Sequence, residues 1–101
     1  MIEIEFDPAK DAINRQKHGI GLAVGAAILR GRHVRYRSLL PNGGNEERWL
    51  AVGRIEGRIL VCIYTVRVGV YRVISLRAAR MKERRAYEEA FRAEWNGSCA
   101  R

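Results

Sequence analysis

The chain has 101 residues, 48% of them hydrophobic, which suits one globular domain and argues against disorder. Its 19 lysines and arginines against 11 acidic residues leave a formal net charge of +8. Such an excess favours an anionic partner (nucleic acid, an acidic protein or a lipid surface), with generic solubility as the alternative. No run approaches the roughly 18 apolar residues that span a membrane. The first residues lack the pattern of a signal peptide, so we expect a cytoplasmic protein.

The two cysteines and two histidines do not form a recognisable ligand pattern. Cys62 lies in an apolar run, whereas Cys99 lies near the end of the chain. Because they differ in setting, we expect neither a disulfide framework nor a metal-ligand cluster with His18 and His33. The sequence therefore predicts no cofactor.

The N-terminal part predicts a strand followed by a helix. Residues Ile2–Phe6 alternate with a period of two, as in a short strand. Asp7 and Pro8 then provide an N-cap and a first helical residue. This helix should run to about His18 and end at Gly19. We expect Ala9, Ala12, Ile13 and Gln16 to face the core, and Lys10, Asn14 and Lys17 to form another stripe.

The middle of the chain predicts a short helix and then four strands. Leu22–Arg30 is rich in alanine and is followed by a glycine, and Arg32–Leu39 resembles a basic strand. A turn at Pro41–Asn45 precedes three further strands with short breaks, which favour antiparallel hairpins. Ile59–Tyr64 is apolar at every position, so it should be a central strand covered on both faces. The three strands predicted after the turn are Glu46–Val52, Arg58–Val66 and Val70–Leu76.

From about Ala79 to Trp95 the pattern is helical, with Tyr87, Ala90 and Phe91 among the apolar positions. We expect these apolar positions to belong to the core or to a partner surface. The order of elements predicts an α+β fold: an antiparallel β-sheet meander, two N-terminal helices and one C-terminal helix, with the helices mainly on one face. Residues 1–95 should form a single domain, and residues 96–101 a frayed tail.

A set of short motifs between residue 6 and about residue 89 is more specific than any of its members alone. The motifs are Phe6–Lys10 with Asn14 and Lys17–Gly19; Glu46–Arg48 leading to Gly53; Gly57–Arg58 leading to Tyr64–Thr65; and Arg72–Ser75 followed by Arg77, Ala79, Glu83–Arg84 and Tyr87. In this order they resemble the BrnT family of type II toxins. Two features depart from that family: Phe6 stands where many relatives have tryptophan, and the loop before Glu46 is rich in glycine and asparagine where many have acidic residues.

The resemblance implies a RelE-like fold, cleavage of RNA without a metal, and neutralisation by a partner antitoxin called BrnA. Such an antitoxin would be a ribbon-helix-helix protein, through which alone the complex would reach operator DNA. We expect no association with membranes.

RNA cleavage of this kind requires a base, an acid and cations that stabilise the charge on the phosphate. Lys17 and His18, at the predicted helix end, place a cation beside the most versatile acid-base side chain. A purely structural role is equally open for His18, because a helix C-terminus favours a histidine at that position.

Glu47 and Arg48 open a predicted strand directly after the long turn. Consecutive strand residues point to opposite faces, so the two side chains cannot share a groove unless a bulge intervenes. The alternative is an exposed edge carrying a weak ion pair. We expect Arg48 to stabilise the phosphate, and Glu47 or His18 to act as base or acid.

Four further arginines are candidates for contacts with RNA. Arg77 ends the last predicted strand and is the strongest catalytic candidate, because its fork matches a phosphate from a rigid position. Arg80 begins the last predicted helix and could complete a phosphate clamp. Arg35 and Arg37 form either a solvated face or a guide for RNA.

Three functions remain open on the sequence alone. The first is a metal-independent endoribonuclease toxin, which uses Arg77, Arg48, Glu47, His18 and Lys17. The second is a non-catalytic nucleic-acid-binding module, and the third is a protein whose basic surface binds an acidic partner. A small, partly acidic ribbon-helix-helix protein encoded next to the gene would favour the first.

Overall fold

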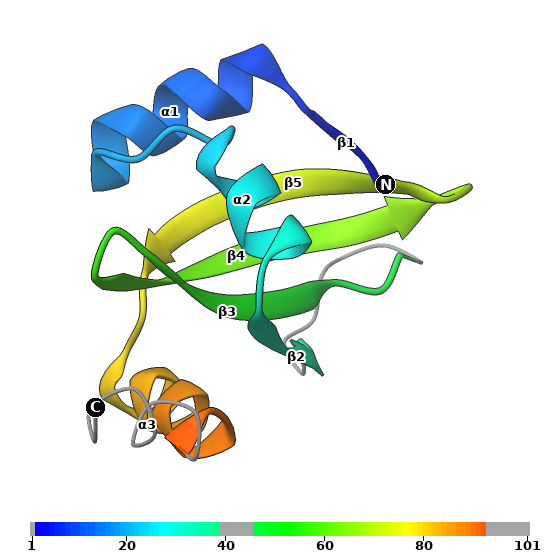
Figure 1. Ribbon diagram of the computed structural model, residues 1–101. Coiled ribbons are helices and arrows are strands. Elements are labelled where there is room, and N and C mark those ends of the chain that lie inside the picture. Colours follow the sequence, from blue (N-terminus) through cyan, green and yellow to red (C-terminus); the bar gives the residue numbers. More distant parts are fainter. Residues whose placement is uncertain (1, 39–45, 93–101) are drawn as a thin grey trace.

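The computed structural model describes residues 2–38 and 46–92 and shows an α+β fold built on one five-stranded sheet (Figure 1). The predicted turn at Pro41–Asn45, the aromatic Trp95 and the tail 96–101 lie outside the described residues. The elements are β1 (Glu3–Phe6), α1 (Pro8–His18), α2 (Val24–Arg30), β2 (His33–Arg37), β3 (Trp49–Ile55), β4 (Arg58–Arg67), β5 (Val70–Ala78) and α3 (Met81–Ala90).

The strand order β1-β5-β4-β3-β2 confirms the meander and corrects one part of the prediction. Strands β2 to β5 pair antiparallel in sequence, with β4 in the centre as expected. However, β1 pairs parallel with β5, so the sheet is mixed rather than purely antiparallel. The chain between β1 and β5 contains two helices and three strands, which is ample for the crossover that a parallel pair requires.

The strand limits differ from the predicted ones around β3. This strand begins at Trp49 instead of Glu46 and continues to Ile55, because the turn to β4 is only two residues long. Glu56 and Gly57 form that turn with positive φ angles of 50° and 81°. Positive φ at both central residues matches the twist of the paired strands, so Gly53 stays within β3.

Helices lie on both faces of the sheet, contrary to the prediction that they gather on one. A Cβ on Gly25 of α2 would stand 3.0 Å from Cys62 Sγ and 3.1 Å from Val73, so α2 packs closely on the side of these two residues. Val61 is adjacent to Cys62 and therefore points to the opposite side, together with its partner Arg77. Arg77 binds Glu83 of α3. We call the two sides the α2 face and the α3 face.

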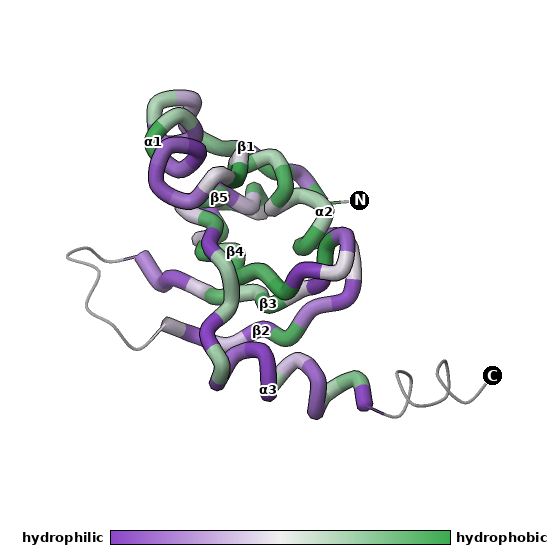
Figure 2. The backbone as a smooth tube through the Cα atoms, turned by 90° about the vertical axis from the view of Figure 1, so that its left-hand side faces the viewer, coloured by the Kyte–Doolittle hydropathy of each residue, from purple (hydrophilic) through white to green (hydrophobic). Residues whose placement is uncertain are grey.

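The main core lies between the α2 face and the segment from Ile20 to Leu29. Leu22, Cys62 and Leu76 are fully buried there, and Ile28 is nearly so. Figure 2 shows the hydrophobic stretches of β3 and β4 in the middle of the molecule, with hydrophilic stretches of α1 and α3 on either side. Among the described residues, no helix is long and apolar enough to cross a membrane.

The side of α1 that faces the body of the protein is polar, which corrects the predicted orientation. Ala9, Ala12 and Gln16 are exposed, and Ile13 is 55% exposed. Asn14 is instead the buried residue of this helix. The reason is the position of α1 beside β5 beyond the end of β1, where the edge of the sheet presents backbone groups that require polar partners.

Candidate functional site

A cavity of about 290 Å³ opens on the α3 face, where α1 meets β5 and the segment leading into β3. Five of its residues come from one side of α1, and the other main contribution is Arg48. The structure thus brings together Lys17, His18 and Arg48, three predicted site residues from two segments that are distant in the sequence. The described residues that line it are Lys10, Ile13, Asn14, Lys17, His18, Arg48, Ile74 and Ser75.

Local signals at both ends of α1 determine which residues lie in its last turn. Asp7 caps the helix by accepting a hydrogen bond from the Ala9 amide at 2.8 Å, and Pro8 occupies the first turn. Gly19 ends the helix at φ 72°, a left-handed conformation that glycine adopts readily, as predicted. Lys17 and His18 therefore lie in the last turn, where a cation interacts favourably with the helix dipole.

Asn14 joins α1 to the edge of β5. Its amide donates to Leu76 O at 2.9 Å and to Ile20 O at 2.8 Å. Its Oδ1 accepts from Leu76 N at 3.1 Å and from the Ser75 hydroxyl at 3.2 Å. The side chain thus replaces a neighbouring strand at the position where β1 has ended, and it holds α1 against the floor of the cavity.

An irregularity in the sheet shapes that floor. The register between β4 and β5 shifts between Ile63 and Tyr64, so that Ile74 is the additional residue on β5. Such a bulge redirects the side chains beside it. Ile74 and Ser75, which are consecutive, consequently both line the cavity. No pattern in the sequence indicates this bulge, although Ile74 and Ser75 both lie in one of the motifs that carried the resemblance.

Glu47 and Arg48 diverge, as their adjacency in the chain suggested. Arg48 lines the cavity, whereas Glu47 approaches Arg37 at 3.6 Å and is exposed. The Thr65 hydroxyl donates to Glu47 O at 2.7 Å and so fixes the backbone before β3. Glu47 is therefore not among the residues that line the cavity, and its predicted role as acid or base stays a prediction.

Arg77 binds a carboxylate at the edge of α3 and does not line the cavity. Its guanidinium donates two hydrogen bonds of 2.7 Å to Glu83, and the two side chains are only 16% and 12% exposed. This pairing lowers the pKa of Glu83. Burial, together with the charge of Glu83, raises the pKa of Tyr36, whose hydroxyl bonds to the same carboxylate. The sequence did not indicate this partner for Arg77, and its catalytic role stays a prediction.

The other predicted RNA contacts lie elsewhere. Arg80 directly precedes α3, where its backbone amide donates to Glu83 at 2.8 Å. Arg35 and Arg37 extend from β2 over the ring of Trp49, at 5.4 and 5.8 Å from its centroid. Trp49 pairs with Tyr64, a core residue of the α2 face, so these two arginines lie on the side of the sheet opposite the cavity.

The chemistry of the cavity is that of an anion site. Two lysines and one arginine converge on it with one histidine, and no carboxylate is among the described residues that line it. Permanent cations can neutralise a phosphate, and a histidine can transfer a proton near neutral pH. Within residues 2–38 and 46–92, no group of three or more His, Cys, Asp or Glu side chains is placed to hold a metal ion. Burial raises the pKa of the Cys62 thiol to about 12, so this cysteine is a core residue and not a nucleophile.

The model of the family described as "Ribonuclease toxin, BrnT, of type II toxin-antitoxin system" matches residues 6–83, which is most of the chain. The protein belongs to the BrnT family. The matched region includes α1, Arg48 and the bulge of β5, so all the described residues that line the cavity lie within it. Membership identifies a ribonuclease toxin of a type II system and implies an antitoxin partner. No curated protein matches the chain.

Proposed function

We propose that this BrnT protein is a metal-independent endoribonuclease whose cavity holds the scissile phosphate, and that a BrnA-like ribbon-helix-helix antitoxin neutralises it. The observation that supports the site is the convergence of Lys10, Lys17 and His18 from α1 with Arg48 from the other side. The α+β fold with helices on both faces of its sheet is compatible with a RelE-like relationship.

The proposed reaction is an attack by the ribose 2′-hydroxyl on the adjacent phosphorus. The P–O5′ bond breaks, and the products are a 2′,3′-cyclic phosphate and a free 5′-hydroxyl. Arg48, with its bidentate donors, and Lys17 stabilise the additional negative charge on the non-bridging oxygens. Lys10 binds the neighbouring phosphate. These cations supply the stabilisation that a metal ion provides in other nucleases.

His18 performs one of the two proton transfers: it removes the proton of the 2′-hydroxyl or protonates the departing 5′-oxygen. Its place on the cavity lining, beside the cation of Lys17, supports this role over a purely structural one. Arg77 and Glu83 are not among the residues that line the cavity, and their ion pair connects β5 to α3. We therefore assign Arg77 a positioning role, in which it holds β5 and α3 together.

The test is cleavage of a defined RNA by purified protein, with and without EDTA. We expect His18→Ala to reduce the rate at least about 100-fold, in the range that a general acid or base contributes. Arg48→Lys should reduce it about tenfold, because the charge is kept and the bidentate fork is lost. EDTA should leave cleavage unchanged.

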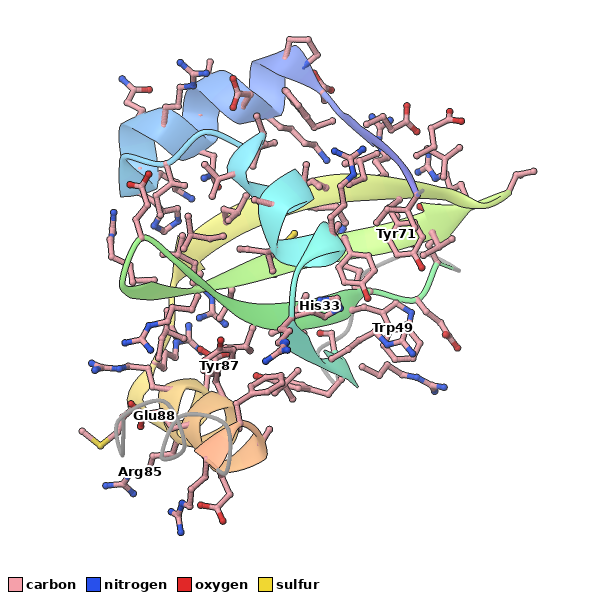
Figure 3. All side chains as sticks on the ribbon, viewed as in Figure 1. His33, Trp49, Tyr71, Arg85, Tyr87 and Glu88 are labelled. Atoms are coloured by element: carbon pink, nitrogen blue, oxygen red, sulfur yellow. The ribbon has the colours of Figure 1, made fainter. Side chains whose placement is uncertain are left out.

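The matched control is Arg85→Ala, which removes one positive charge from an exposed position on α3 (Figure 3). It should change the rate less than twofold. Full activity of a folded His18→Ala protein would remove the histidine from the mechanism. Loss of cleavage in EDTA that Mg²⁺ or Zn²⁺ restores would refute metal independence.

A further inference from the structure

The α2 face continues beyond α2 toward the turn between β4 and β5, and this end carries aromatic and apolar side chains. Tyr71 stacks on Tyr64 with ring centroids 5.5 Å apart. Figure 3 shows Tyr71 and Trp49 to the right of α2, on the part of the sheet that the helix leaves open. Tyr71 pairs with Ile4 on one side and with Val66 on the other, so one apolar row crosses three strands.

The turn beyond that row contains an unusual residue. Val68 is fully exposed, with a relative accessibility of 103%, and has a φ angle of 48°. A β-branched residue rarely adopts a positive φ, because its Cβ crowds the backbone. Gly69 follows at φ 79°. Asparagine or glycine would form the same turn without strain. Valine at this position is therefore unfavourable both for the backbone conformation and for exposure to water.

The turn between β3 and β4 provides an internal comparison. Glu56 and Gly57 have nearly the same φ angles, 50° and 81°, and the first position there is charged. The geometry of the turn therefore does not require an apolar residue. Val66, two residues before Val68, is also 43% exposed. Strain and exposure thus coincide at the end of the apolar row, as they do at sites that bind a partner.

Arginines border this end of the sheet. Arg35 and Arg37 extend over Trp49 from the edge strand β2 and are exposed, and Arg37 also lies 3.6 Å from Glu47. We define the distal patch as Ile4, Trp49, Val66, Val68 and Tyr71, with Arg35 and Arg37 at its border. An apolar centre of aromatic residues with arginines around it is the composition of a protein-binding surface.

We propose that the distal patch is the docking surface for an amphipathic, acidic segment of the antitoxin. Apolar side chains of that segment cover Tyr71, Val66 and Val68, while its carboxylates pair with Arg35 and Arg37. A protein segment fits better than RNA because the strained Val68 offers no polar group to a nucleotide. This inference rests on the proposed neutralisation by an antitoxin and is independent of the mechanism in the cavity.

The first experiment changes the turn alone. Val68→Asn replaces an exposed, strained side chain with one that tolerates positive φ, so the melting temperature should stay or rise by about 4 °C. Glu56→Asn makes the same change in the other turn and serves as the control. The binding probe is the purified product of the reading frame next to the toxin gene. We expect its affinity to fall at least about tenfold for Val68→Asn and to stay within twofold for Glu56→Asn.

The second experiment reverses charge. The double variant Arg35→Glu with Arg37→Glu should weaken binding of the same probe at least about 100-fold, whereas Arg84→Glu with Arg85→Glu, an equal change on exposed α3 positions, should affect it much less. Unchanged binding of the probe by both patch variants would refute the docking surface. Loss of RNA binding with retained probe binding would assign the patch to RNA instead.

Cleavage of RNA is measured with the same preparations. A wild-type protein that binds the probe through the patch but does not cleave RNA would reject the cavity mechanism and leave the docking surface intact. If the wild type cleaves RNA and neither patch variant weakens probe binding, the docking surface is refuted and the cavity mechanism stands.

Discussion

Replacement of Asn14 tests the most important structural contact of the site. Its amide satisfies the backbone N–H and C=O of Leu76 and the carbonyl of Ile20, and the side chain is only 5% exposed. In Asn14→Leu these backbone groups lose their partners in a buried position. An unsatisfied buried group costs about 1–3 kcal/mol, and the buried apolar surface of leucine offsets part of the total. We therefore expect the free energy of unfolding to fall by about 2–4 kcal/mol.

The assay is chemical denaturation at neutral pH, supported by thermal melting. Gln16→Ala, an exposed position on the same helix, is the control and should change stability by less than about 0.5 kcal/mol. Asn14→Asp keeps the acceptor and loses the donors, so it should be destabilised at neutral pH and should approach the wild type as the pH falls and the buried carboxyl becomes a donor. A loss below about 1 kcal/mol in Asn14→Leu would show that Asn14 does not replace a strand.

Three further outcomes follow from the ion pair of Arg77 and from the charge of the cavity. Arg77→Lys cannot form both parallel contacts with Glu83, so stability should fall by about 1–2 kcal/mol while cleavage stays within threefold; a tenfold loss of cleavage by the folded variant would restore the catalytic role predicted from sequence. Because Arg77 lowers the pKa of Glu83 below its ordinary value of 4.5, the pair stabilises the fold fully above that value, and this stabilisation is lost as the pH falls through the lowered pKa. Glu83→Gln should therefore show a flatter decline of stability in acid, and an equally steep decline would contradict the assignment. For RNA binding, Arg48→Ala should reduce the slope of log affinity against log salt by about 0.7, as expected for one lost phosphate contact to a single strand, and an unchanged slope would place Arg48 outside the phosphate site.

Local signals in the sequence were sufficient where local chemistry decides the structure. Asp7, Pro8 and Gly19 act within one turn of the chain, and they begin and end α1 as predicted. The apolar run around Cys62 requires cover on both faces, which makes β4 the central strand. The parallel pairing of β1 could not be predicted in the same way, because it depends on which strand edge is free after the meander has formed.

The orientation of α1 shows why apolar periodicity predicted the wrong side of this helix. The pattern of Ala9, Ala12 and Ile13 suggests a helix that packs on a hydrophobic core. At the edge of a sheet, however, the partner groups are backbone amides and carbonyls, and a buried Asn14 satisfies them better than any aliphatic residue. The stripe of Lys10, Asn14 and Lys17, which resembles a solvated side, is consequently the side that forms the cavity.

The site residues show the same division between local and long-range information. Alternation along the extended segment that leads into β3 correctly separated Glu47 from Arg48, since this requires only the geometry of an extended chain. The partner of Arg77 depends on the direction in which α3 leaves the sheet, because five residues that include the end of β5 and the start of α3 separate Arg77 from Glu83. The direction of a helix relative to the preceding strand has no signature in a single sequence.

The start of β3 separates the cavity from the distal patch, which limits how an antitoxin could inhibit this protein. Arg48 and Trp49 are consecutive, yet one lines the cavity and the other belongs to the distal patch on the opposite face. A segment docked on the distal patch therefore leaves the cavity open, unless a second segment passes around the edge of the sheet. Without that second segment, one route by which docking would reach the cavity is the backbone before β3, which the Thr65 hydroxyl holds through its hydrogen bond to Glu47 O. In that case a dinucleotide would still bind the complex but would be cleaved slowly, whereas physical blockage would abolish its binding.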